Sequence, residues 1–305
     1  MKNINNRFIL RYTQQDDYDF IGEMIDYSNK NIDKELGYPR CDNLGELLAE
    51  IELYENTLEN SLFIISYDDK PIALGGYLYT EGDDEGYFIG PIIKEEYYNK
   101  ENIKAIINLI LDVKKDVLNE FKVNLEAVLS KNNKLLNECY LELEWDYKRT
   151  VREMRYDIDG VKKETLQWRI TEFYKNDYII MNDIFKLLDK TFNWNGNHEK
   201  INELLKEDYR VGCVFDKENN VLGVVCWAYL KEVDFSRLEY LVVKEQYRKN
   251  RIGEAMINHV INDSIDNKVT CIYLNTGINN NAANLYKKTG FYDTVVSNIY
   301  GKSSF

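Results

Sequence analysis

The chain has 305 residues, 44% hydrophobic and 30% charged, with a formal net charge of −13. This length suggests two globular domains, and the negative charge disfavours nucleic acid and anionic membranes as partners while favouring cationic small molecules. The five cysteines form no C-x-x-C pair and the two histidines show no ligand pattern, which argues against a disulfide framework or a metal site. No apolar stretch approaches membrane-spanning length, so we expect a cytoplasmic protein, either a monomer or a homodimer.

Hydrophobic periodicity predicts a mixed α/β chain. In the first half, an apolar strand over Ile89–Ile93 leads into a polar and then helical stretch. The second half is expected to contain, in chain order, a strand at Trp168–Thr171, a helix at Tyr178–Leu188, a hairpin of Val211–Phe215 and Val221–Tyr229, a strand at Leu238–Val243, a helix at Ile252–Ile265, a strand at Val269–Leu274 and a short helix at Ala282–Lys288.

The two halves resemble each other. Residues 94–108 align without gaps with residues 244–258, 150 positions later, and each stretch follows an apolar strand. Downstream, Asn133, Tyr140 and Trp145 repeat the spacing of Asn279, Tyr286 and Phe291, now 146 positions apart. Two ordered matches at nearly one offset indicate a duplicated domain. We therefore predict one domain over residues 1–158, a polar linker over 159–166 and a second domain over 167–305.

A strand, a basic loop and a helix follow one another in the second half. Arg248, Lys249 and Arg251 precede a helix that begins near Gly253. Free backbone N–H groups and the positive end of the helix dipole meet at such a helix start, and glycine allows an anion to approach the backbone closely. The pattern predicts a phosphate or pyrophosphate site, although a solvated basic helix start would give the same pattern.

At this point the sequence resembles the GNAT superfamily of acyltransferases. The run Arg248-Lys-Asn-Arg-Ile-Gly253 is similar to the family's cofactor motif, with Arg251 in place of its middle glycine. A second family element follows, from Asn279 through Tyr286 to Phe291. The resemblance implies two tandem GNAT-like domains, each a mixed, mostly antiparallel sheet flanked by helices. It also implies that acetyl-CoA is bound by the residues Leu241, Val242, Val243, Arg248, Lys249, Asn250, Arg251, Ile252, Gly253, Glu254, Asn279 and Tyr286.

The implied reaction transfers an acyl group from a thioester to a neutral amine. By the resemblance, Tyr286 is the general acid that protonates the leaving thiolate. Glu239 is a candidate for the proton acceptor because a partly buried carboxylate with a raised pKa suits that role, and Asp234 is a weaker one. Asn193, Trp194 and Trp227 are candidates for lining the acceptor pocket, although buried aromatic residues more often belong to the core.

The first half has lost the features of a cofactor site. In the alignment Tyr98 replaces Arg248, Glu101 replaces Arg251 and Ile103 replaces Gly253. A glutamate repels a pyrophosphate, and isoleucine prevents close backbone approach. We therefore expect a degenerate first copy beside a catalytic second copy.

Several functions fit these observations. The leading hypothesis is an N-acetyltransferase acting on a primary amine of a small, cationic molecule such as a polyamine or an amino sugar. The alternatives are acetylation of a protein or peptide, and a non-catalytic acyl-CoA-binding sensor. Transfer from aminoacyl-tRNA is a further alternative, which the negative charge disfavours.

Overall fold

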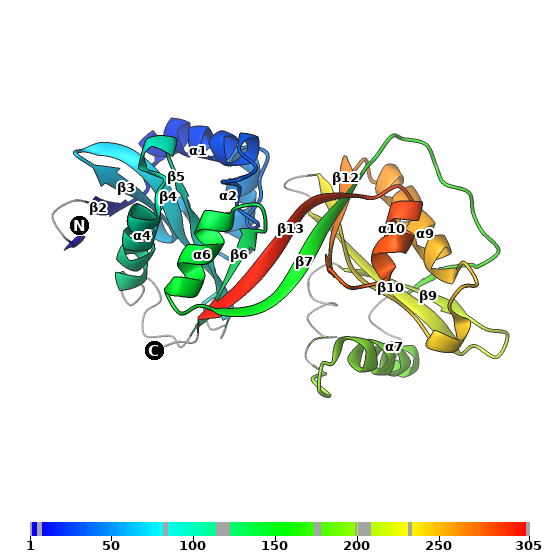
Figure 1. The fold of residues 1–305 in the computed structure, drawn as a ribbon. Coiled ribbons are helices and arrows are strands. Elements are labelled where there is room, and N and C mark those ends of the chain that lie inside the picture. Colours follow the sequence, from blue (N-terminus) through cyan, green and yellow to red (C-terminus); the bar gives the residue numbers. More distant parts are fainter. Residues whose placement is uncertain are drawn as a thin grey trace. The chain divides into compact units, whose positions relative to one another are not determined.

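The computed structural model describes residues 2–4, 8–81, 85–113, 123–173, 178–198, 200, 209–230 and 234–302. The chain forms two compact units (Figure 1). Unit 1 consists of Met1–Val151 and Val295–Phe305, and unit 2 of Arg152–Thr294. Both combine helices with a mostly antiparallel sheet, as the sequence predicts.

Unit 1 is built on a sheet in the strand order β1-β2-β3-β4-β5-β6-β13-β7. Helix α1 packs on the sheet next to α2, and α4 packs against α6. Its strands are β1 (Lys2–Ile4), β2 (Phe8–Tyr12), β3 (Leu62–Tyr67), β4 (Lys70–Tyr79), β5 (Glu85–Ile93), β6 (Asn124–Ser130) and parts of β7 (Asp146–Asp157) and β13 (Tyr292–Lys302). Its helices are η1 (Gln15–Asp17), α1 (Tyr18–Lys30), α2 (Leu44–Leu53), α3 (Leu58–Ser61), η2 (Glu95–Tyr97), α4 (Lys100–Asp112) and α6 (Lys134–Glu142).

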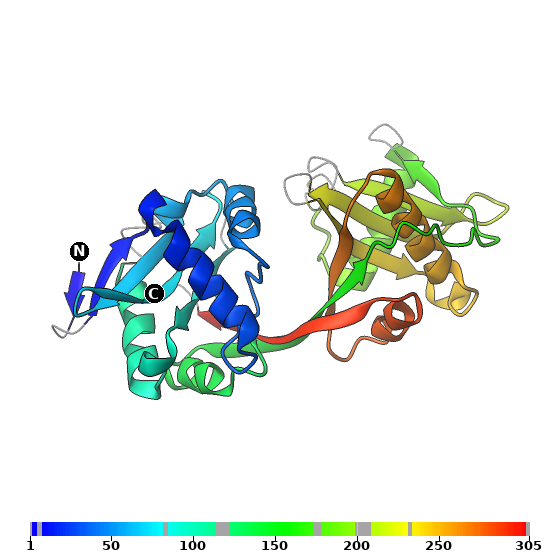
Figure 2. The ribbon, with the colours of Figure 1, turned by 90° about the horizontal axis from the view of Figure 1, so that it is seen from above.

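Unit 2 is built on a sheet in the order β7-β12-β11-β10-β9-β8. Two hydrophobic clusters cover its faces, one formed with α7 and the other with α9 and α10 (Figures 1 and 2). Its own strands are β8 (Thr171–Phe173), β9 (Arg210–Phe215), β10 (Val221–Leu230), β11 (Phe235–Val243) and β12 (Cys271–Gly277). Its helices are α7 (Tyr178–Phe192), η3 (Glu245–Tyr247), α9 (Ile252–Asp266) and α10 (Ala282–Lys288).

The parallel strand pair of each unit is short. In unit 2, β11 pairs with β12 only over Phe235–Arg237, although β11 continues to Val243. In unit 1, β5 pairs with β6 only over Glu85–Tyr87. Beyond these pairs the neighbouring strands separate, and a helix begins a few residues after the end of each longer strand. From the hairpin strands onward (β3 in unit 1, β9 in unit 2) the two units repeat the same described elements in the same order, as the duplicated sequence predicts.

Strands β11 and β12 and helix α7 differ from their expected bounds by two to four residues at one or both ends, and two further differences concern the region between residues 151 and 171. Trp168 lies before β8 in an irregular segment, so the predicted strand at Trp168–Thr171 is wrong for its first three residues. The compact units divide the chain at Val151 and Arg152, and residues 295–305 group with unit 1. By contrast, the sequence places the division at residues 159–166. The segment that connects β7 to β8 belongs to unit 2.

Candidate functional site: a cleft at the start of helix α9

Unit 2 contains a cleft of about 760 Å³ beside the end of β11. It is bounded by the last residues of β11, the loop that follows, the first turn of α9, the first turns of α10 and the end of α7. Nine of the predicted cofactor residues line it: Leu241, Val242, Val243, Arg248, Lys249, Arg251, Ile252, Gly253 and Glu254.

The first turn of α9 presents unsatisfied backbone donors. Within the described part of the chain, no group accepts a hydrogen bond from the N–H of Arg251, Ile252, Gly253 or Glu254, and the N-cap residue Arg251 makes no side-chain cap. Unpaired N–H groups at a helix start attract anions, and the helix dipole adds to this attraction. Gly253 also allows close packing, since a Cβ there would lie 2.7 Å from Cδ2 of Leu285 on α10.

Four cationic side chains surround these donors: Arg248, Lys249, Arg251 and Lys288 line the cleft. One carboxylate, Glu254, lies among them, 2.8 Å from the Arg251 guanidinium and 3.2 Å from the Lys288 ammonium. The hydrogen bonds from Arg251 lower the pKa of Glu254 to about 2, so this carboxylate is ionised at neutral pH. In a chain of net charge −13, this cationic group marks an anion-binding position.

Within the described residues, β11 has no pairing with β12 over Leu241–Val243, because the register between the two strands ends at Arg237; the Val243 carbonyl instead accepts a 3.1 Å hydrogen bond from Nε of Arg248. The opposite edge remains paired with β10, from Gly223 opposite Val243 to Val225 opposite Leu241. An unpaired strand edge can accept an extended ligand through backbone hydrogen bonds. Next to the cationic helix start, this edge suits a long ligand with one anionic end.

Tyr286, the predicted general acid, lies on α10 and is 6% exposed. Burial raises the pKa of its phenol to about 12, so the hydroxyl is protonated near neutral pH. Within the described residues no group accepts a hydrogen bond from this hydroxyl. Tyr286 is not among the lining residues of the cleft, but its neighbour Leu285 is.

Glu239, the predicted proton acceptor, is the extra residue of a β-bulge. Tyr240 pairs with Cys226 and Leu238 with Trp227, which leaves Glu239 unpaired in the register. Its carboxylate lies 3.0 Å from Nε of Arg237 and accepts a hydrogen bond of 3.4 Å from the Tyr209 hydroxyl. Glu239 therefore already has partners, and it does not line the cleft. The weaker candidate, Asp234, is exposed in the turn before β11.

Three asparagines, none of them predicted from the sequence, line the cleft in place of Asn279. Asn280 accepts a 3.0 Å hydrogen bond from the N–H of Ala282, the first residue of α10, whereas the N-cap residue Asn281 makes no side-chain cap. Asn280, Asn281 and Asn284 line the cleft, whereas Asn279 is exposed and does not. The run of asparagines at 279–281 was the available signal in the sequence. Which of them contacts the helix start depends on the exact first residue of the helix, which the sequence does not give. Asn250 also lies outside the lining, with its side chain bonded to the Tyr247 carbonyl at 3.2 Å.

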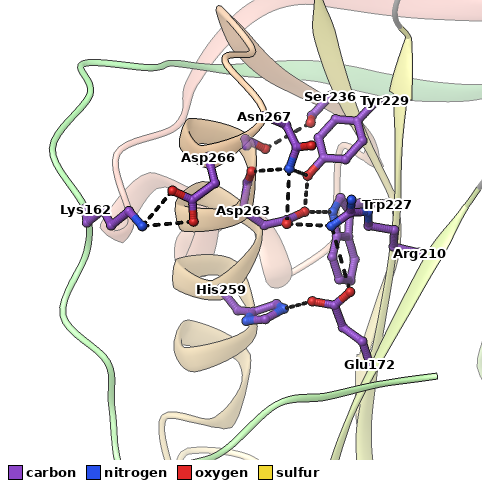
Figure 3. Close-up of polar contacts among 11 residues, drawn as sticks. Lys162, Glu172, Arg210, Trp227, Tyr229, Ser236, His259, Asp263, Asp266 and Asn267 are labelled. Carbon is purple, nitrogen blue, oxygen red and sulfur yellow. Dashed lines mark hydrogen bonds and ion pairs between the residues drawn. The ribbon is translucent and has the colours of Figure 1, made fainter.

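The predicted acceptor-pocket residues separate between the faces of the sheet. Trp227 is fully buried and donates a 2.8 Å hydrogen bond to Asp263 of α9, so it is a core residue (Figure 3). Trp194 packs edge-on against Tyr240, with ring centroids 5.5 Å apart, on the face covered by α7. Phe192 at the end of α7 also packs on Tyr240 and lines the cleft, which the sequence did not predict.

In unit 1 the protein's own side chains occupy the corresponding positions. Asn99 caps α4 by accepting a 3.0 Å hydrogen bond from the N–H of Asn102. Tyr98, the counterpart of Arg248, donates to Asn133, and Tyr140, the counterpart of Tyr286, donates to the Gly90 carbonyl. The groups that would meet a cofactor in unit 2 are therefore bonded internally in unit 1.

Comparison with known proteins agrees with this geometry. Residues 181–291 match the family described as acetyltransferase (GNAT) family. A GCN5-related N-acetyltransferase from Sphaerobacter thermophilus superposes with a TM-score of 0.67 at 13% identity, covering 98% of this chain and 96% of that one. None of the curated protein sequences matches the chain.

Two further structures cover nearly the whole chain. A tandem GNAT protein from the clavulanic acid biosynthesis pathway has a TM-score of 0.56 at 7% identity, covering 97% of this chain and 98% of that one. A GNAT-family acetyltransferase from Colwellia psychrerythraea has a TM-score of 0.52 at 12% identity, covering 98% and 100%. At these identities the likeness concerns the fold. Of the helices that the structure describes, none is long and apolar enough to cross a membrane.

Proposed function

We propose, on the premise that residues 181–291 match the GNAT acetyltransferase family, that unit 2 transfers an acetyl group from acetyl-CoA to a primary amine of a small cationic molecule. The observation that carries the proposal is the first turn of α9. The residues that carry its free N–H groups line a cleft together with four cationic side chains, beside the part of β11 that does not pair with β12. A pyrophosphate suits the helix start, and a pantetheine arm suits the strand edge.

In the proposed reaction the amine nitrogen attacks the thioester carbonyl, a C–N bond forms and the C–S bond breaks. Tyr286 gives its phenolic proton to the departing thiolate, a role supported by the raised pKa that keeps the phenol protonated. Glu239 receives the proton lost by the amine, which requires its carboxylate to exchange its contact with Arg237 for one with the acceptor. A cationic acceptor is favoured by the net charge of −13.

Calorimetric titration with acetyl-CoA tests the cofactor assignment. We expect one site per chain, abolished by Gly253→Glu, which places a carboxylate among the N–H donors. Glu101→Gln, at the aligned position of Arg251 in unit 1, is the matched control and should leave binding unchanged. Two sites per chain would contradict the assignment of unit 1 as degenerate, and absence of binding would contradict the cofactor.

A non-catalytic acyl-CoA-binding protein is the second candidate. It is favoured by two observations: Tyr286 does not line the cleft, and Glu239 is paired with Arg237. Release of free thiol from acetyl-CoA, measured with polyamines, amino sugars and peptides in turn, separates the candidates. Amine-dependent release supports the enzyme and ranks the acceptor classes, whereas binding without release with any amine supports the sensor.

A further inference from the structure

The segment of residues 158–170, which connects β7 to β8, is irregular but lies along helix α9 (Figure 3). It runs antiparallel to the helix, so that its early residues meet the end of α9 and its late residues meet the loop before α9. We call this segment the connector. Its contacts all lie within unit 2.

Three polar side chains of α9 hold the connector. Asp266 pairs with the Lys162 ammonium at 2.7 Å, and Asn262 exchanges two hydrogen bonds with the backbone of Lys163, at 2.6 and 3.0 Å. Asn258 donates a 3.1 Å hydrogen bond to the Glu164 carbonyl. Because these three helix residues are spaced by four, they lie on one face of α9 and form a continuous attachment.

The last contact of the connector reaches the predicted cofactor loop. The indole Nε1 of Trp168 donates a 2.7 Å hydrogen bond to the carbonyl of Asn250. This residue lies between Lys249 and Arg251, which both have positive φ angles, of 65° and 62°. Such a backbone conformation costs free energy in non-glycine residues, so external contacts have to maintain it.

The bond to Asn250 also orients the next N–H group. In a planar trans peptide the C=O and N–H bonds point in opposite directions. When the Asn250 carbonyl is held toward Trp168, the N–H of Arg251 points away from the connector. Arg251 lines the cleft, and within the described residues this N–H has no acceptor. The Trp168 contact therefore aims the free N–H of this cleft-lining residue away from the connector.

The helix itself is held separately. On the sheet side, Asp263 accepts hydrogen bonds from Arg210 at 2.6 Å, from Trp227 at 2.8 Å and from Tyr229 (Figure 3). Loss of the Trp168 contact should thus loosen the loop that precedes α9 and leave the helix in place.

We propose that Trp168 is a positioning residue of the cofactor site: its indole N–H fixes the peptide between Asn250 and Arg251 so that the loop is preorganised for the pyrophosphate. The inference rests on the proposed function of unit 2. Preorganisation lowers the ordering cost of binding, so its loss should weaken affinity and leave the chemical step unchanged.

The test variant is Trp168→Phe, which keeps an aromatic ring and removes the N–H. We expect the Kd and KM for acetyl-CoA to rise about 3- to 10-fold with kcat unchanged, as for loss of one hydrogen bond to the binding loop. Asn258→Ala is the matched control, because it removes a connector bond that does not reach the loop, and its Kd should stay within about twofold of the wild type.

Hydrogen exchange on the ligand-free protein gives a readout that does not depend on the cofactor. In Trp168→Phe the amides of residues 249–253 should exchange faster, while those in the second half of α9 should keep their wild-type rates. Unchanged loop exchange together with an unchanged Kd would overturn the proposal, as would faster exchange throughout α9, which indicates a merely structural role. A wild type that binds no acetyl-CoA would instead refute the proposed function and, with it, positioning for this cofactor, and the exchange data would still show whether Trp168 orders the loop.

Discussion

Arg251 has a φ angle of 62° at the start of α9, a conformation in which an L-residue is strained by about 1 kcal/mol. Its side chain also pairs with Glu254 at 2.8 Å and lines the cleft. Glycine at this position would relieve the backbone strain but would also remove the positive charge.

The variant Arg251→Gly tests both effects, because the strain acts on stability and the charge on ligand affinity. We expect the free energy of unfolding in urea to rise by about 0.5–1 kcal/mol, because the strain is relieved. The affinity for acetyl-CoA should fall several-fold, because a cation beside the pyrophosphate is lost. Arg251→Lys keeps both the charge and the strain and should change each quantity little. If Arg251→Gly binds acetyl-CoA as tightly as the wild type, the guanidinium has no part in the site.

Substitution of Tyr286 tests the proposed role of its hydroxyl as the general acid. Tyr286→Phe should leave the Kd for acetyl-CoA unchanged and lower kcat by roughly 100-fold or more, the usual contribution of a positioned acid. The acid acts when protonated, and its pKa is raised to about 12, so its activity is present at neutral pH and lost only as the pH rises toward 12. Any fall in rate between pH 7 and 9 must then come from another group.

The matched control for this prediction lies in unit 1. Tyr140 donates its hydroxyl to the Gly90 carbonyl, and Tyr140→Phe should cost about 1 kcal/mol of stability without changing the rate of acetyl transfer. Equal losses of rate in both variants would mean that neither hydroxyl acts in catalysis.

The helices α4 and α9 occupy equivalent places in the two units but differ in what their first-turn N–H groups bind. The first turn of α4 is capped by Asn99, which uses an N–H donor internally. The first turn of α9 has no side-chain cap and leaves its donors for a ligand. A missing cap destabilises a helix by about 1 kcal/mol, so α9 depends more on its contacts with the sheet.

Asp263 supplies the main polar contact of this kind. Asp263→Asn removes the nearer carboxylate of the Arg210 guanidinium, which keeps only Glu172 at 3.9 Å, and we expect the free energy of unfolding to fall by about 1–3 kcal/mol. Asp266→Asn, in the exposed pair with Lys162, should cost less than about 1 kcal/mol. Urea denaturation at neutral pH measures both, and equal effects would show that the partial burial of Asp263 is unimportant.

The elements that the sequence predicts well are those with strong local signals. The helix α10 begins and ends at the predicted residues, since Gly290 stops it in a left-handed conformation with φ of 107°. The helical periodicity of residues 252–265 predicts the start of α9 correctly and its end to within one residue. Local patterns such as caps, glycines and apolar spacing depend on neighbouring residues only, and are therefore readable from the chain.

The features that the sequence does not reveal depend on distant partners. The bulge at Glu239 arises from the register between β10 and β11, which no local pattern encodes. Trp168 is of a residue type that is common in strands, but its indole donates a hydrogen bond to a loop that lies 82 positions later. The basic loop and the helix start were thus readable from the sequence, whereas the distant contacts that hold them were not.

At the scale of the whole molecule, duplication has preserved the fold while the two sites diverged. Tyr140 and Tyr286 occupy equivalent positions and are both buried, as are Trp145 and Phe291. Core positions persist because both sheets need them, whereas the residues at the start of α4 differ from those at the start of α9, as expected if only unit 2 binds the cofactor. We expect the acetyl-CoA stoichiometry to report this asymmetry directly.

The C-terminal strand makes a second prediction at this scale. Residues Ser297–Lys302 of β13 pair with Leu125–Ser130 of β6 inside unit 1, and Tyr300 is buried in the core of that unit. A fragment of residues 1–158 should therefore be unstable and prone to aggregate, because the edge of β6 is exposed. Joining residues 292–302 to this fragment through a flexible linker should restore cooperative unfolding. A well-folded monomer of residues 1–158 alone would contradict the role of β13.

This pairing has a consequence for how the protein is made. Partners in unit 1 are separated by about 170 residues, so the last strand of that unit leaves the ribosome after the whole of unit 2 has been synthesised. At the usual rate of translation, roughly 5–20 residues per second, the incomplete sheet of unit 1 waits for on the order of ten seconds or more. During that interval the edge of β6 in the nascent chain lacks its β13 partner. We expect the dependence of expression on chaperones to increase with the length of this interval.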